Sequence, residues 1–147
     1  MEKARVSTFA GVRFYSRNLD PLYITQQLRL PADSTHRVGE PRLFRTKSGK
    51  VIEHGVYSEG MWQISSKAWV NSSKLSTHID WLLVELEPKA EYIIELMTQG
   101  VKGDIFCYSY GSDEPPSIPN SIRQRAEKLG LQIDIDHYSA ETVSAHN

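Results

Sequence analysis

Apolar and polar positions alternate along the chain with two different periods. Apolar residues at every second position predict strands at 12–16 and 61–64, and a closing strand at 131–135 with one polar face. From 73 to 87, apolar residues recur every three or four positions, which predicts an amphipathic helix with one buried stripe. The chain therefore combines both kinds of secondary structure.

Glycines and prolines set the ends of further elements near the N-terminus. Asp20 and Pro21 are of the types preferred at the cap and in the first turn of a helix, and Pro31 ends that helix. The segment 6–9 extends the first strand past Gly11, where we expect a bulge.

Two or three antiparallel strands are expected between residues 36 and 70. The sequence at 47–50 is typical of a turn and separates strands at 43–44 and 51–52. Another strand is predicted at 68–70, which places Trp69 in a strand.

The second half of the chain continues with alternating helices and strands. A helix after Pro88 ends near Gly100, and a helix at 117–130 follows a strand at 104–110 that is apolar on both faces, as in the centre of a sheet. This order predicts an α+β two-layer sandwich, in which a mixed, mostly antiparallel sheet has helices on one face. The nearest known plan is a ferredoxin-like core.

The whole pattern predicts a single α+β domain over residues 1–138. The remaining residues, 139–147, are polar, and we expect them to form a flexible C-terminal tail.

Composition excludes several classes of protein. The chain has 147 residues, 39% of them hydrophobic and one a cysteine, so it can form a core and cannot form an internal disulfide. No apolar run is long enough for a membrane helix, and the first residues lack the apolar stretch of a signal peptide. We therefore expect a cytoplasmic protein with no membrane association and no cofactor.

Charge is unevenly distributed although the net charge is only −1. Residues 1–50 contain ten Lys/Arg and four Asp/Glu, whereas residues 51–147 contain seven Lys/Arg and fourteen Asp/Glu. Folding can either mix these two populations or keep them on separate surfaces.

Short motifs spread over most of the chain resemble those of one family. In chain order they are Val12-Arg13-Phe14-Tyr15-Ser16, Leu19-Asp20-Pro21, Leu30-Pro31, His36-Arg37-Val38-Gly39-Glu40, Trp62, His78-Ile79, Leu82-Leu83, Leu86-Glu87-Pro88, Leu129-Gly130-Leu131 and Asp134-Ile135-Asp136-His137-Tyr138. In order and spacing the chain resembles the bacterial family called domain of unknown function 4279 (DUF4279). It departs from the family pattern at Leu28-Arg29, where members often carry Leu-Gly. The resemblance implies a fold and a bacterial origin, and it implies no catalytic or binding residues.

A protein-binding module is the leading functional hypothesis because the chain has no recognisable catalytic motif. Trp69 and Trp81 are of the type enriched in interface hot spots, and Glu85, Glu91 and Glu95 would accompany them on an acidic surface. A specific version is an immunity-type protein that neutralises a toxin, since a negative face steers onto a basic nuclease. That version requires the fourteen acidic residues after position 50 to gather on one surface.

A metal-dependent enzyme is the first alternative. Asp134 and Asp136 share one face of the predicted last strand and offer oxygen ligands for a divalent cation, with His137 reaching from the other face. The same alternation also fits the solvated face of an edge strand, where like charges resist pairing with another chain.

Nucleophilic catalysis is a weaker form of the enzyme hypothesis. Cys107 paired with His78, His36 or His137 would supply a nucleophile and a base. No nucleophile motif surrounds Cys107, and its apolar strand favours the role of a small hydrophobic residue.

A nucleic-acid binder is the second alternative, through the basic segment 37–50. Phe44 and Trp62 lie close to this segment in sequence and could stack on bases. The near-neutral charge of the whole chain argues against this role, since nucleic-acid-binding domains are usually clearly basic. The basic residues of the segment are Arg37, Arg42, Arg45, Lys47 and Lys50.

Overall fold

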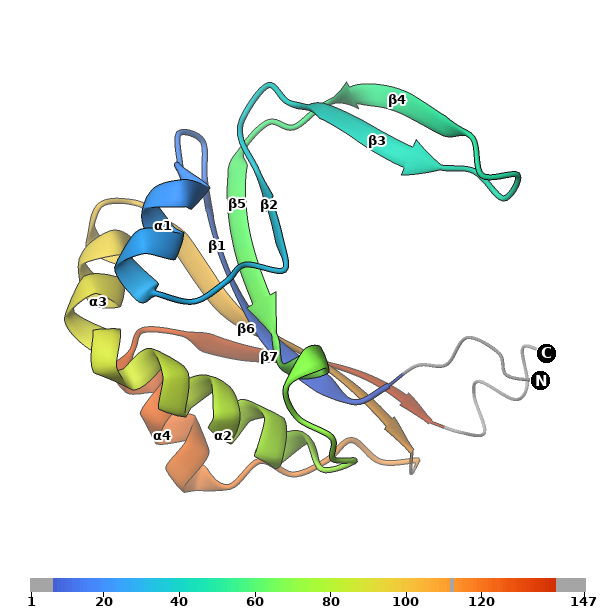
Figure 1. The fold of residues 1–147 in the computed structure, drawn as a ribbon. Coiled ribbons are helices and arrows are strands. Elements are labelled where there is room, and N and C mark those ends of the chain that lie inside the picture. Colours follow the sequence, from blue (N-terminus) through green and yellow to red (C-terminus); the bar gives the residue numbers. More distant parts are fainter. Residues whose placement is uncertain (1–6, 112, 140–147) are drawn as a thin grey trace.

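A five-stranded sheet carries the helices on one of its two faces, which makes a two-layer α+β sandwich (Figure 1). The computed structural model describes residues 7–111 and 113–139. Across the sheet the strand order is β2-β5-β1-β6-β7, and every neighbouring pair is antiparallel except β6 and β7. The predicted fold class is therefore confirmed. These strands are β1 (Phe9–Ser16), β2 (Ser34–His36), β5 (Gly60–Ser65), β6 (Lys102–Gly111) and β7 (Gln132–Ser139).

The strands β2, β5, β1 and β6 form a ferredoxin-like core, and a direct connection from β6 to β7 extends it at one edge. Helix α4 (Asn120–Lys128) joins these two strands, which are parallel and hydrogen-bonded to each other. In a split βαβ unit of the ferredoxin-like plan, another strand lies between the two parallel strands. Two units of this sheet are split in this way, because β5 lies between β1 and β2, and β1 lies between β5 and β6. The predicted ferredoxin-like core is therefore confirmed, with β7 added beside β6.

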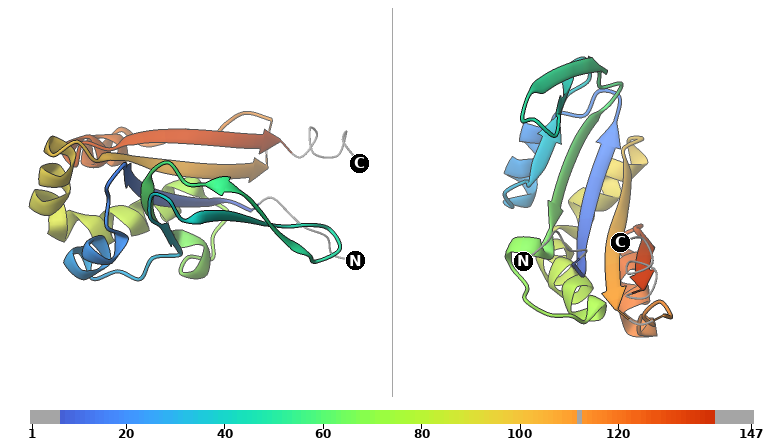
Figure 2. Two further views of the ribbon diagram at one scale, coloured as in Figure 1. Left: turned by 90° about the horizontal axis from the view of Figure 1, so that it is seen from above. Right: turned by 90° about the vertical axis from the view of Figure 1, so that its right-hand side faces the viewer.

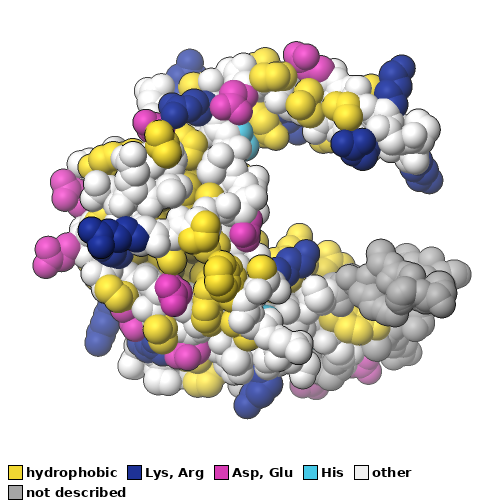
Figure 3. Space-filling model, in the orientation of Figure 1, with side chains coloured by type: hydrophobic (Ala, Val, Ile, Leu, Met, Phe, Trp, Pro, Cys, Tyr) yellow, Lys and Arg dark blue, Asp and Glu magenta, His cyan; other side chains and the backbone are white. Residues whose placement is uncertain are grey.

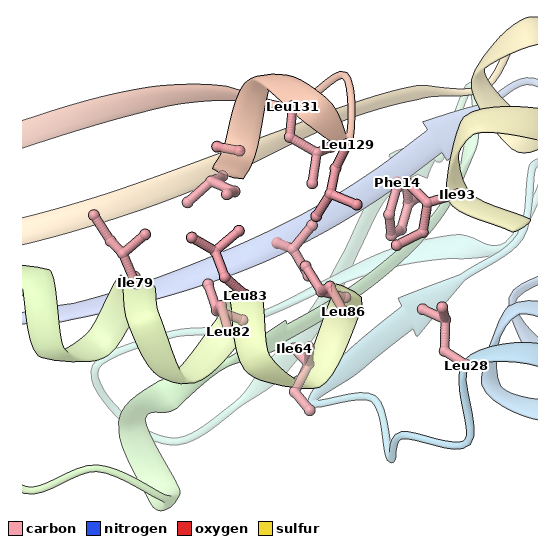
Figure 4. Close-up of a cluster of buried hydrophobic side chains, with 14 of the residues drawn as sticks. Phe14, Leu28, Ile64, Ile79, Leu82, Leu83, Leu86, Ile93, Leu129 and Leu131 are labelled. Atoms are coloured by element: carbon pink, nitrogen blue, oxygen red, sulfur yellow. The ribbon is translucent and has the colours of Figure 1, made fainter. Parts of the chain in front are cut away.

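The helical layer packs through the stripe that the sequence predicts. It contains α1 (Pro21–Leu28), α2 (Leu75–Leu86), α3 (Ala90–Thr98), α4 and the short 3-10 helices η1 (Ser66–Ala68) and η2 (Glu87–Lys89). The stripe of α2 faces the sheet, and each of its side chains is at most 2% exposed (Figure 4). Burying a side chain of this kind contributes about 1.5–3 kcal/mol, so α2 anchors the layer. The stripe residues are Leu75, Ile79, Leu82, Leu83 and Leu86.

An ion-pair network fixes α4 against the end of α2. Arg125 donates two hydrogen bonds to the carboxylate of Glu87, at 2.8 and 2.9 Å, and one to Asp80 at 2.7 Å. The bonds to Arg125 lower the pKa of Glu87. Because these groups are largely exposed, the network orients the helices more than it stabilises the fold.

The expected bulge at Gly11 is absent. β1 keeps a continuous register with both neighbours, in which Gly11 pairs with Ser65 on one side and Phe106 on the other. The glycine is explained by packing: an added Cβ would collide with the ring of Phe106 and lie 2.8 Å from the carbonyl oxygen of Ile64. Sequence alone could not separate this close approach from a bulge.

The expected strand at 68–70 is also wrong. Ser66–Ala68 form η1, and Trp69 follows it as the C-terminal capping residue. Buried hydrogen bonds hold this turn, since Ser66 Oγ lies 2.5 Å from Nδ1 of His78 and accepts from the backbone N–H of Ala10. Side-chain bonding to the backbone therefore overrides the apolar pattern here.

A two-stranded ribbon projects away from the main sheet. β3 (Pro41–Arg45) and β4 (Val51–Val56) extend beyond the main sheet (Figures 1 and 2) and pair only with each other within the described residues. All of their side chains are exposed. The predicted turn at 47–50 is confirmed between them, with Gly49 at a φ of 89°. We call residues 37–57 the arm.

The expected C-terminal tail, residues 139–147, falls within the described residues only at Ser139. Ser139 is the last residue of β7, whereas the rest of the expected tail lies outside the described residues. None of the described helices combines the length and apolar character that a membrane crossing requires.

Arg29 has the left-handed conformation that usually belongs to glycine. It caps the C-terminus of α1 at φ 57° and ψ 39°, and it is the only described non-glycine residue with a positive φ. The Cβ of Arg29 therefore brings strain that a glycine would avoid.

We expect Arg29→Gly to stabilise the protein. Relief of the left-handed strain, less the extra chain entropy of glycine when unfolded, should raise the free energy of unfolding by about 0.5–1 kcal/mol. Urea denaturation measures this change. Arg29→Ala is the control, since it keeps the Cβ and should give no gain, and an equal gain from alanine would contradict the strain explanation.

Candidate binding surface

The face of the sheet opposite the helices is lined with aromatic side chains. Along β1 and β6 the outward positions alternate with fully buried ones, so Phe9, Phe106 and Tyr108 lie on the uncovered face. Phe9 contacts both other rings, with ring centroids 6.4 Å from Phe106 and 5.0 Å from Tyr108. Tyr108 in turn stacks on Tyr138 of β7 at 6.2 Å. A continuous run of rings therefore crosses three strands.

Arg13 occupies the centre of this face. Its guanidinium binds the carboxylate of Asp104 on the neighbouring strand through two hydrogen bonds of 2.8 and 3.2 Å. The same group lies 5.4 Å from the ring centroid of Phe106 and 5.9 Å from that of Tyr15. The bond to Asp104 raises the pKa of Arg13, so this cation is permanently charged.

Two shallow hollows flank Arg13. One, of about 500 Å³, is lined by Phe9, Phe106, Tyr108, Gln63 and Lys67 among others, and the second, of about 300 Å³, lies toward β2 beside Tyr15 and His36. We call this surface the open face: the outward residues of β1, β5, β6 and β7 with the residues that border these hollows. Mixed aromatic, cationic and acidic groups of this kind are typical of recognition surfaces.

The arm continues the open face through stacked planar groups. Tyr57 stacks on His36 with ring centroids 3.5 Å apart and an interplanar angle of 9°. The guanidinium of Arg42 lies 5.8 Å from Tyr57 and 5.4 Å from Phe44 on the arm. His36 also borders the smaller hollow, so the two surfaces are joined.

A hollow separates the arm from the body of the molecule, as the space-filling view shows (Figure 3). We call the arm and the open face together the cradle. Both sides of the cradle carry apolar side chains that are accessible from the gap or at its rim. The geometry fits the binding of another chain.

The tryptophan pair predicted for protein binding does come together, at a different place. Trp69 is 56% exposed and stacks on the half-buried Trp81 with ring centroids 6.0 Å apart. Glu85 lies one turn further along α2, whereas Glu91 and Glu95 are exposed on α3. This group belongs to the helical layer and offers no hollow of its own.

The predicted metal ligands do not form one group. Asp134 and Asp136 lie on the open face, where Asp136 accepts a hydrogen bond from Tyr138. His137 points to the helical side and lies 3.1 Å from Ser109 Oγ. Among residues 7–111 and 113–139, no three His, Cys, Asp or Glu side chains are grouped to hold a metal.

Cys107 and His137 lie on the same inner face of β6 and β7, whereas His78 lies on α2. Cys107 is buried on the inner face, where burial, and secondarily the charge of Asp134, raises the pKa of its thiol to about 12. His78 is buried against Ser66, and its Nε2 lies 2.8 Å from the carbonyl oxygen of Ser72. These bonds make His78 a structural link between α2 and η1.

The predicted nucleic-acid residues all lie on the arm. Arg37 pairs with Asp20 at 2.8 Å, and Arg45 donates to the carbonyl of Gly49. Phe44 is on the same ribbon, whereas Trp62 is fully buried and donates from its indole N–H to Thr25. Trp62 is therefore not available to stack on a base. The remaining members of the group are Arg42, Lys47 and Lys50.

Sequence reasoning missed the aromatic residues of the open face. Phe9, Phe106 and Tyr108 alternate with buried residues, but all of them are apolar or aromatic, so the pattern indicated a strand buried on both faces. A useful signal was Gly11, because a glycine inside a strand often marks a close approach by another group.

The family comparison agrees with the resemblance seen in the motifs. The family model described as domain of unknown function (DUF4279) matches residues 6–140, and the chain therefore belongs to this family. No curated protein and no solved structure matches the chain.

We expect Gly11→Ala to damage the open face and the fold. The new methyl group must displace the ring of Phe106 and the backbone of Ile64, which should cost about 2 kcal/mol or more in unfolding free energy. Chemical denaturation measures the loss. In the double variant Gly11→Ala/Phe106→Ala the second change should cost little or nothing further, and fully additive losses would contradict the proposed contact.

We expect the thiol of Cys107 to be inert in the folded protein. With a pKa of about 12, the thiolate is only about one part in ten thousand at pH 8, and burial blocks access. A thiol-specific chromogenic reagent should react after unfolding in denaturant and not before. Rapid reaction of the native protein would contradict this assignment and revive a nucleophilic role.

Proposed function

We infer that the protein is a non-catalytic protein-binding module and that the cradle is its binding surface. The observation that carries this proposal is the uncovered aromatic face of the main sheet, which continues into an arm exposed on both sides. Aromatic and arginine side chains at the centre of such a surface supply most of the binding energy in protein interfaces. A bacterial, cytoplasmic setting is part of the proposal.

The distribution of acidic residues bears on the immunity-type version. Acidic side chains after position 50 lie on the arm (Glu53), on the helices (Glu91 and Glu127) and on the open face (Asp134). This spread removes the single negative face that would steer the protein onto a basic toxin. The proposal therefore rests on the cradle, and a toxin is one of several partners that the cradle would accept.

Nucleic-acid binding is the second candidate, because one observation favours it. All five basic residues of the predicted site lie on the arm together with Phe44, where Arg42 covers the ring. Carboxylates on the open face, among them Asp134 and Asp136, would repel a phosphate backbone, so protein remains the better partner.

Affinity capture with matched variants tests the proposal. Tagged protein should retain one protein chain in stoichiometric amount from nuclease-treated lysate at moderate salt, either another protein or an untagged copy expressed beside it. Phe44→Asp on the arm and Tyr108→Ala on the open face should each weaken capture by about tenfold or more, as expected when a hot-spot side chain is lost.

Two control variants on the helical layer give the experiment its specificity. Val84 is 53% exposed, so Val84→Asp matches Phe44→Asp in chemistry and exposure and should leave capture unchanged. Trp69→Ala removes the exposed member of the tryptophan pair. Capture that depends on Trp69 and not on Phe44 or Tyr108 would contradict the cradle, and capture lost on nuclease treatment would favour nucleic acid.

A further inference from the structure

The arm is a ribbon that lacks a layer to cover it. The large apolar side chains of its two strands are 42–58% exposed and lie on both faces, with Phe44 opposite Ile52 on one face and Leu43 and Val51 on the other. A two-stranded ribbon in water is marginally stable without such a layer. A partner that covers the arm would therefore stabilise it as well as bind it.

Opposite charges lie on the two sides of the cradle. The arm contains five Lys/Arg and two Asp/Glu. The open face has the reverse balance, with Arg13, Lys67 and Lys102 against five carboxylates. The pair of Arg13 with Asp104 is neutral, so Lys67 and Lys102 remain against four carboxylates. The acidic residues of the open face are Asp33, Glu59, Asp104, Asp134 and Asp136.

Two surfaces of opposite charge on one chain, here the arm and the open face, can bind each other in a dimer with a two-fold axis. In such an isologous pair, the arm of each copy contacts the open face of the other, so every contact is made twice. The hollow between the arm and the body is open in the space-filling view (Figure 3). Within one molecule the same hollow keeps the arm away from its own open face.

We propose that a second copy of this chain occupies the cradle, with arms exchanged about a two-fold axis. This inference rests on the proposed function, because it names the partner of the same surface. The apolar side chains of the arm would cover the rings of the open face, and the basic tip of the arm would approach Asp134 and Asp136 of the other copy.

Sedimentation velocity of the full chain over a wide concentration range is the first measurement. We expect a reversible monomer–dimer equilibrium, with the mass of two chains at high concentration. A mass of one chain at every concentration overturns the second-copy assignment. In that case, if the chain captures a different protein and Phe44→Asp abolishes this capture, the proposed function remains valid although the partner is not a second copy.

Charge-reversed variants identify the surfaces in contact. Lys47→Glu/Lys50→Glu places negative charge on the arm, and Asp134→Lys/Asp136→Lys places positive charge on the open face. Each variant alone brings like charges together, and we expect its dimer dissociation constant to rise about tenfold or more. These side chains are exposed, so the fold should tolerate both changes, and thermal unfolding checks this.

Mixing the two variants provides the decisive outcome. In the mixed pair each arm again meets an oppositely charged face, so the heterodimer should form with nearly the affinity of the original protein. The control Glu91→Lys/Glu95→Lys on α3 makes the same kind of change on the helical layer and should leave the dimer unchanged. The exchanged-arm arrangement is overturned if the arm and face variants leave the dimer dissociation constant unchanged. It is also overturned if mixing the two variants does not restore the affinity.

Discussion

The one-sided burial of the main sheet is the constraint on which the rest of the structure depends. Along β1, the side chains of Ala10, Val12 and Phe14 are completely buried under the helical layer, while the residues between them face outward. The stripe of α2 supplies most of the cover on the inner side. Because the helices α1 to α4 lie on that side, the outer side chains are left to pack on one another, and aromatic rings with Arg13 do so. The open face is thus a consequence of how the core is covered.

Three local features turn this uncovered face into a shaped surface. Gly11 lets the ring of Phe106 lie flat on the sheet, and the ion pair of Arg13 with Asp104 fixes the two central strands at their outer side. The stack of Tyr57 on His36 then leads from the sheet to the arm. Each feature joins residues that are far apart in sequence, so the cradle exists only in the folded chain.

The sequence was sufficient to predict the fold class and most of the elements. The spacing of Leu75, Ile79 and Leu82 is a local signal for a helix, and the structure bears it out. Local signals failed where contacts between distant residues determine the local structure. A 3-10 helix, η1, forms in place of the expected strand because Ser66 bonds to His78. Gly11 makes room for the ring of Phe106 and does not form a bulge. The binding surface was the least predictable, since outward aromatic residues in β6 have the same pattern as buried ones. The basic character of the arm was visible in sequence, but its projection away from the sheet was not.

The central claim is that the arm and the open face form a surface that another protein chain covers. Hydrogen exchange of the full chain, measured at low and at high protein concentration, tests it most directly, because exchange reports opening residue by residue. The account predicts that backbone amides of β3 and β4 become more protected at high concentration, together with those near Phe9 and Tyr108, while amides of α2 do not change. Arm amides that exchange equally fast at both concentrations and in the presence of any captured protein would contradict it.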